Sequence, residues 1–123
     1  MAGYESYAER FATWGYVTLR WNPHEGALGG VTQATRGRMA AELINWVIAE
    51  SKDTTSVLYG KIDTTKGVVQ AGHSLGGKTA LLAAVHNPSV VGYVLMDPVG
   101  KNPSDSSFSP SQNFTFQYQF QII

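Results

Sequence analysis

The sequence predicts an α/β protein in which a parallel sheet lies between flanking helices. Segments with strand composition alternate with segments of helical periodicity over the first hundred residues. Two of the strand segments are short and largely apolar, as is typical of strands covered on both faces. Between two of these elements stands a G-x-S-x-G pattern at residues 72–76. The connections are long enough for crossovers between parallel strands.

The first predicted element is a short helix. Its apolar residues Tyr4, Ala8, Phe11 and Trp14 recur at spacings of four and three, which places them on one helix face. Gly15 follows where helices often end in a left-handed residue.

A strand and a second helix follow. Residues 16–21 are rich in aromatic and β-branched residues, as strands are. Residues 22–30 form a loop by their Pro and Gly content. A helix is predicted over residues 33–50. We expect its buried stripe to consist of Met39, Leu43, Trp46 and Val47, widened by Ile44 and Ile48.

The centre of the sheet is predicted from the next apolar segments. After a polar connection in which Leu58 and Tyr59 dip into the core, residues 68–71 read as a central strand. Residues 75–86 are predicted to be a helix, and residues 90–96 another strand of the buried type.

Composition limits the class of protein. The chain of 123 residues is at most one domain, and its nine basic and nine acidic residues give no support for a nucleic-acid partner. Without cysteine there is no disulfide framework and no thiolate metal site. No apolar stretch approaches the ~20 residues of a membrane span, and no secretory signal begins the sequence. We therefore expect a soluble protein, with the compartment left open.

The serine between glycines is the candidate reactive group. In G-x-S-x-G the serine occupies a sharp turn from strand to helix at a positive φ, so that the hydroxyl of Ser74 would project from the sheet. Gly72 and Gly76 would lack the Cβ atoms that collide in such a turn, and Gly77 would leave further room. The Leu75 N–H would then face a developing oxyanion. The alternative is a glycine-rich turn with an incidental serine.

The segment "AGHSLGGKTALLAA" resembles the nucleophile elbow of α/β-hydrolases, and of the chlorophyllase-like group in particular. Lys78 after Gly77 and the strand ending "LMDPVG" are shared with that group, while "KIDTTKGVVQAGHSLGG" is also similar to cutinase-like polyester hydrolases. The resemblance covers about residues 4–100. It implies a partial α/β-hydrolase fold and a serine esterase that works through an acyl-enzyme, without metal or organic cofactor. The substrate would be a small-molecule or lipid-like ester; a lipase is a further reading.

The same resemblance implies which residue is the acid of a catalytic triad but does not identify the histidine that would be its base. Asp97 would be the triad acid, although an Asp before Pro also suits a plain turn. The superfamily order is Ser, Asp, His, and no histidine follows His86 in the sequence. His73 lies within the elbow, faces away from the hydroxyl and is predicted to be structural. His24, in a loop, is a possible pocket residue or substitute base, but a solvated position is favoured.

The overall organisation is expected to be incomplete. Residues 1–103 are predicted to be the central part of a hydrolase domain, and residues 104–123 an atypical Ser/Pro then Phe/Gln tail. That tail alternates with period two, which predicts a strand, but one that fits the preceding architecture poorly. Three strands alone would leave raw edges open to self-association. A catalytically inactive, hydrolase-like binding domain is the alternative function.

Overall fold

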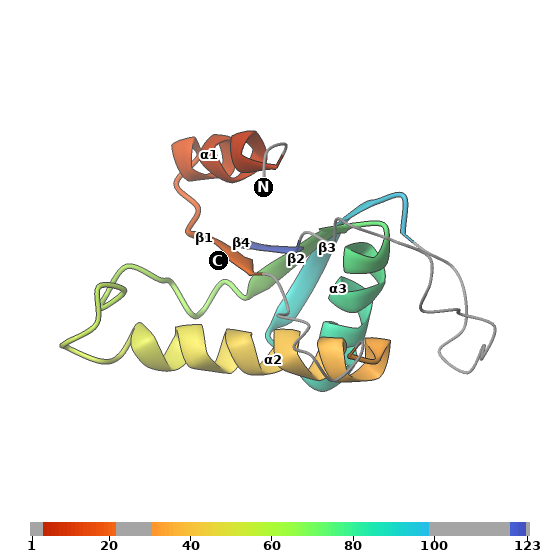
Figure 1. The fold of residues 1–123 in the computed structure, drawn as a ribbon. Coiled ribbons are helices and arrows are strands. Elements are labelled where there is room, and N and C mark those ends of the chain that lie inside the picture. Colours follow the sequence, from red (N-terminus) through yellow and green to blue (C-terminus); the bar gives the residue numbers. More distant parts are fainter. Residues whose placement is uncertain (1–3, 22–30, 99–118, 123) are drawn as a thin grey trace.

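A computed structural model describes residues 4–21, 31–98 and 119–122; for residues 119–122 it describes the backbone. Over these residues the chain forms three helices and a four-stranded sheet, with helices on both faces of the sheet (Figure 1). The elements in chain order are α1 (Glu5–Thr13), β1 (Thr18–Trp21), α2 (Gln33–Glu50), β2 (Val68–His73), α3 (Leu75–His86), β3 (Val90–Met96) and β4 (Gln119–Ile122). The α/β class is therefore confirmed.

The sheet is mixed, with strand order β1–β4–β2–β3. Strands β2 and β3 are parallel, and β4 is antiparallel to both β1 and β2, so β1, β2 and β3 all run in the same direction. The expectation that the tail fits this architecture poorly is wrong for residues 119–122. They supply backbone hydrogen bonds to β1 and β2, which do not pair with one another. The rest of the tail lies outside the described residues.

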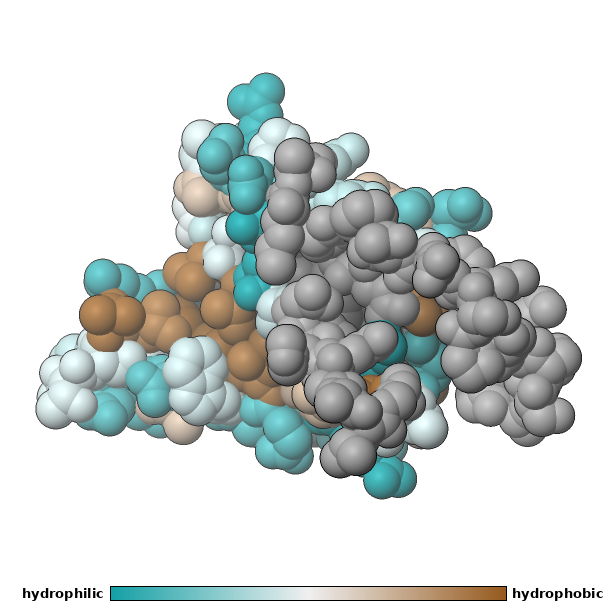
Figure 2. All heavy atoms as spheres, viewed as in Figure 1, coloured by the Kyte–Doolittle hydropathy of each residue, from teal (hydrophilic) through white to brown (hydrophobic). Residues whose placement is uncertain are grey.

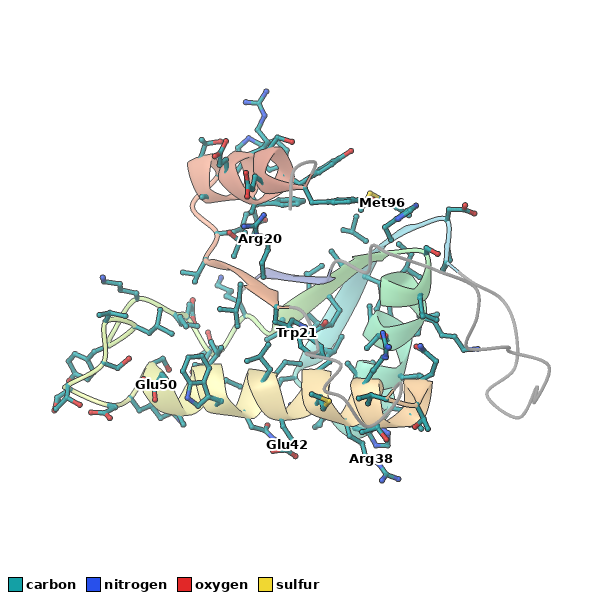
Figure 3. All side chains as sticks on the ribbon, viewed as in Figure 1. Arg20, Trp21, Arg38, Glu42, Glu50 and Met96 are labelled. Carbon is teal, nitrogen blue, oxygen red and sulfur yellow. The ribbon has the colours of Figure 1, made fainter. Side chains whose placement is uncertain are left out.

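The helix α1 covers one face of the sheet, and α2 and α3 cover the other (Figure 1). On the α1 face the Thr18 hydroxyl lies 3.4 Å from the Ala8 carbonyl oxygen, and Arg20 forms an ion pair of 3.3 Å with Glu5. Arg20 points toward α1 and its neighbour Trp21 toward α2 (Figure 3), as alternation along a strand requires. Side chains at alternate positions of β1 therefore face α1 on one side of the sheet and α2 on the other.

Helices α2 and α3 pack closely against one another. A Cβ on Gly37 of α2 would overlap the Leu82 side chain of α3, so glycine permits the approach. At the end of α3 the Asn87 amide donates to the Ala41 carbonyl at 3.1 Å and to Asn45 Oδ1 at 2.9 Å. These bonds fix the end of α3 to the middle of α2.

The predicted buried stripe of α2 is wrong in part. Met39 is 38% and Trp46 49% exposed, and Leu43 and Ile48 are only half-buried. The buried face consists of Arg36, Gly37, Ala40, Ala41, Ile44 and Val47. Close contact with α3 selects small residues, so the face of α2 that meets α3 is not its most apolar face.

Strand β3 is less buried than its sequence suggests. Val91 is 64% exposed, and Tyr93 and Val94 are also exposed, because β3 lies at the edge of the sheet. In the loop before β2, Leu58 is half-buried but Tyr59 is exposed, and Ile62 enters the core instead. Apolar residues still gather visibly between α1 and α2 (Figure 2). No helix in the described part of the chain is long and apolar enough to span a membrane.

Candidate active site

Ser74 occupies a strained junction. It is the single residue between the end of β2 and the start of α3, and its φ of 52° and ψ of −118° lie outside the regions that side chains favour. Such a conformation costs about 1–3 kcal/mol. Ser74 stands at the N-cap of α3 but makes no side-chain capping bond, and it is half-buried. Its hydroxyl is therefore not used to cap the helix.

Two glycines make this turn possible. A Cβ on Gly72 would overlap the carbonyl group of Gly76 and lie 2.6 Å from the Gly77 nitrogen. A Cβ on Gly77 would lie 3.0 Å from Pro98 Cβ and 3.2 Å from the Gly72 oxygen. The strand and the first helical turn thus cross at backbone contact distance, which only glycine allows.

Backbone hydrogen bonds hold both sides of Ser74. Its N–H donates to the Met96 carbonyl of β3 at 2.9 Å. Its own carbonyl accepts from the N–H groups of Gly77 at 3.1 Å and Lys78 at 3.4 Å. Leu75 is the first helical residue, so its N–H has no partner four residues back. That N–H is a backbone donor adjacent to the serine.

Asp97 lies at the end of the neighbouring strand. Register pairs His73 with Met96, so Ser74 and Asp97 follow paired residues at the same edge of the sheet. Asp97 is exposed and, with a φ of 44°, is the other non-glycine residue with positive φ among the described ones. The structure brings the predicted serine and acid to adjacent strand ends.

The histidines take different positions. His73 packs against Tyr4, the N-cap residue of α1, with ring centroids 5.9 Å apart, and its Nδ1 is buried without a hydrogen-bond partner. The His73 ring therefore lies against the start of α1, and its structural role stays a prediction. His86 is exposed in the last turn of α3, at the opposite end of that helix from Ser74. His24 lies outside the described residues.

Two aspartates with altered titration lie in turns of the loop before β2. Hydrogen bonds from the Thr65 hydroxyl at 2.6 Å and its N–H at 3.0 Å lower the pKa of Asp63. Bonds from the N–H and hydroxyl of Thr55 likewise lower the pKa of Asp53. Both aspartates are exposed, so their carboxylates belong to solvated turns of the loop. Within the described ranges no three His, Asp or Glu residues lie together as a metal site.

A cavity of about 300 Å³ lies between α1 and the sheet. Its lining is contributed by α1, β2 and β3: Tyr7, Arg10, Phe11, Trp14, Ala71, Val94 and Met96. Met96 connects this cavity to the serine, because its carbonyl is the acceptor for the Ser74 N–H. Figure 3 shows Met96 at the end of β3. The cavity therefore lies directly beside the edge that carries Ser74 and Asp97.

Comparison with protein families identifies the group. The family model described as "Putative esterase" matches residues 11–120, which is most of the chain. The chain belongs to this esterase family. The esterase family is an α/β-hydrolase family, in agreement with the observed fold. No curated protein and no solved structure matches the chain.

Three residues near the candidate active site of this esterase-family chain were not predicted from the sequence. Tyr4 was recognised as part of a helix face, but its contact with His73 depends on where α1 lies. The Asp-Pro pair suggested only a turn, but Pro98 lies so close to Gly77 that a Cβ there would be 3.0 Å from Pro98 Cβ. Met96 lines the cavity. The Asp-Pro pair after a strand was the available signal for Pro98; the other two contacts are tertiary and leave none.

Proposed function

We propose that the chain is a serine hydrolase acting on carboxylic esters, with Ser74 as the nucleophile of a nucleophile elbow. The observation that carries the proposal is the positive φ of Ser74 at a turn so tight that Gly72 has no room for a Cβ. In this motif the strain serves to expose the serine oxygen at the top of the sheet. Membership of the esterase family supports the reaction class.

The reaction proceeds by acyl transfer. A base takes the proton of Ser74 Oγ as that oxygen attacks the ester carbonyl, the bond to the alcohol oxygen breaks, and the alcohol leaves with the proton. Water then attacks the acyl-enzyme, which releases the carboxylic acid and restores the serine. The Leu75 N–H donates to the oxyanion, and Asp97 orients the base and stabilises its charged form.

The base in this proposal is a histidine, and His24 is the histidine of this sequence whose position the structure does not describe. A second candidate function is a catalytically inactive, hydrolase-like binding domain. The positions of the two described histidines favour it: His73 packs on Tyr4, and His86 lies at the far end of α3 from Ser74. The two functions differ in whether Ser74 is activated, because an unactivated serine is a weak nucleophile.

Labelling with a fluorophosphonate probe tests the proposal. We expect the wild-type chain to be labelled, Ser74→Ala to be unlabelled, and the control Ser89→Ala to be labelled like wild type. Loss of labelling in His24→Ala would identify His24 as the base. A folded wild-type chain that is not labelled would favour the inactive binding domain.

A separate measurement decides which class of ester the enzyme prefers. A chlorophyllase-like enzyme would release phytol from chlorophyll, whereas a cutinase-like or lipase-like enzyme would prefer polyesters or acyl esters. We expect hydrolysis of p-nitrophenyl esters in either case, since the nitrophenolate leaving group needs little assistance. Activity on chlorophyll that exceeds activity on these esters would select the chlorophyllase-like branch.

A further inference from the structure

We infer that the cavity beneath α1 binds the uncharged hydrocarbon arm of the ester, so that the preferred substrates carry a medium-sized apolar acyl or alkyl group. This inference rests on the proposed function, because it assigns a substrate class to the Ser74 site. It depends on three features: where the cavity lies, what lines it, and how much apolar surface it leaves exposed.

The cavity adjoins the reacting edge. Within the sheet, Ala71 pairs with Val94 and His73 pairs with Met96, and both pairs lie on the face that α1 covers. His73 and Met96, which pair across the two strands, directly precede Ser74 and Asp97 in the sequence. Successive residues of a strand rise about 3.3 Å. An ester held at Ser74 therefore needs to pass only one row of side chains to reach the cavity.

The lining selects an apolar, uncharged group. Aromatic residues Tyr7, Phe11 and Trp14 form the α1 side of the cavity. The one charged residue in the lining, Arg10, is exposed and has its guanidinium carbon 6.0 Å from the centroid of the Trp14 ring. Arg10 thus contributes its hydrocarbon stem to the wall while its charge remains at the surface. A charged arm would find no partner inside.

The apolar surface around the cavity is left exposed. Trp14 is 62%, Tyr7 46% and Val94 39% exposed in the described structure. The volume of about 300 Å³ is at the lower end of small-molecule sites. A hydrocarbon arm of moderate length would cover these side chains, whereas a large multi-ring group would not fit.

Binding of ester analogues that cannot be hydrolysed tests the inference in the full chain carrying Ser74→Ala. Methyl ketones from butanone to nonanone retain the carbonyl and extend one arm by a methylene at a time. We expect affinity to rise about fourfold per methylene until the cavity is filled. Binding should change the fluorescence of Trp14, so the signal should be lost in Trp14→Phe and kept in Trp46→Phe.

A matched pair of variants on β3 locates the site. Val94→Phe fills the cavity and should weaken binding of the longest ketone about tenfold. Val91→Phe adds the same ring near the start of β3, at an exposed position outside the lining, and should leave binding unchanged. A second variant, Trp14→Ala, should shift the preferred arm to a longer one. It removes a largely exposed side chain, so the fold should survive.

The outcomes separate this inference from the proposed function. Ketone binding with the expected length dependence, but no ester hydrolysis by the wild type, would support the cavity and overturn the proposed function. Hydrolysis with no dependence on arm length, or equal effects of Val94→Phe and Val91→Phe, would overturn the cavity assignment alone. A dimer by sedimentation that Val94→Phe dissociates, without ketone binding, would assign the cavity to a second copy and overturn the inference.

Discussion

Gly72→Ala is the most direct test of how the serine is held. The added Cβ would overlap the Gly76 carbonyl group and lie 2.6 Å from the Gly77 nitrogen. Those atoms are backbone, so no rotamer change relieves the contact. Reaching an ordinary separation requires the start of α3 to move by roughly 1 Å relative to β2. Such a movement would stretch the hydrogen bond between the Ser74 N–H and the Met96 carbonyl.

The expected loss of stability follows from these two effects. Overpacking costs about 1–3 kcal/mol and a weakened backbone hydrogen bond about 0.5–1.5 kcal/mol. We therefore expect Gly72→Ala to lower the free energy of unfolding by roughly 1.5–4.5 kcal/mol. Urea unfolding followed by tryptophan fluorescence measures this change. Fluorophosphonate labelling should fall with it, because the Ser74 turn is displaced.

Gly92→Ala is the matched control. Gly92 lies in the neighbouring strand β3, and a Cβ there would meet only Val69 Cγ2 at 3.7 Å, which is an ordinary contact. We expect no loss, or a gain of up to about 1 kcal/mol from the reduced entropy of the unfolded chain. Equal unfolding midpoints for the Gly72 and Gly92 variants would refute the claim that backbone crossing holds the serine.

Three further predictions concern parts of the fold outside the turn. Gln70→Met should raise the free energy of unfolding by about 1–3 kcal/mol in thermal denaturation, since Gln70 is fully buried and both polar atoms of its side chain lack a partner; a loss of stability would mean that the amide is satisfied. Asn87→Ala should cost about 1–3 kcal/mol in urea unfolding, because it leaves the Ala41 carbonyl without its side-chain donor and loosens α3 from α2; an unchanged midpoint would contradict this. The lowered pKa of Asp63 means that its ionised form stabilises the folded chain above the unfolded pKa, and that this stability is lost as the pH falls through the folded pKa. Asp63→Asn should therefore make stability less dependent on pH in acid than in wild type, and an identical acid profile would exclude a contribution from this turn.

Local signals in the sequence were sufficient for most elements. The bounds of α2 and α3 agree with the predicted helices. In the structure Thr32 caps α2 by accepting from the Thr35 N–H at 3.2 Å, and Asn87 ends α3 just before a proline. Strand β2 is two residues longer than predicted, since glycine and histidine carry little strand propensity but pair with β3. Period two correctly indicated a strand in the tail. Its place between β1 and β2 depends on long-range pairing, which local composition does not encode.

The candidate site, like the fold, has one part that local sequence predicts and one part that depends on long-range packing. Gly72, Ser74 and Gly77 were predictable because a tight turn restricts the residue type at each position. The cavity was not, because Phe11 and Trp14 look the same in the sequence whether they pack against a core or line a hollow. The buried face of α2 was mispredicted for a related reason. Hydrophobicity indicates that a helix is buried somewhere, but only packing against α3 decides which face.

The positions of Ser74 and Asp97 at this edge of the sheet are fixed by backbone contacts rather than by a network of side-chain hydrogen bonds. Ser74 and Asp97 are the two positive-φ residues other than glycine in the described structure, and they stand at the ends of neighbouring strands. Such strain persists only where the surroundings over-determine it. Here two features couple the turns: the hydrogen bond from the Ser74 N–H to the Met96 carbonyl, and the close approach of Pro98 to Gly77, which leaves no room for a Cβ. A disturbance at either strand end is therefore expected to displace both turns.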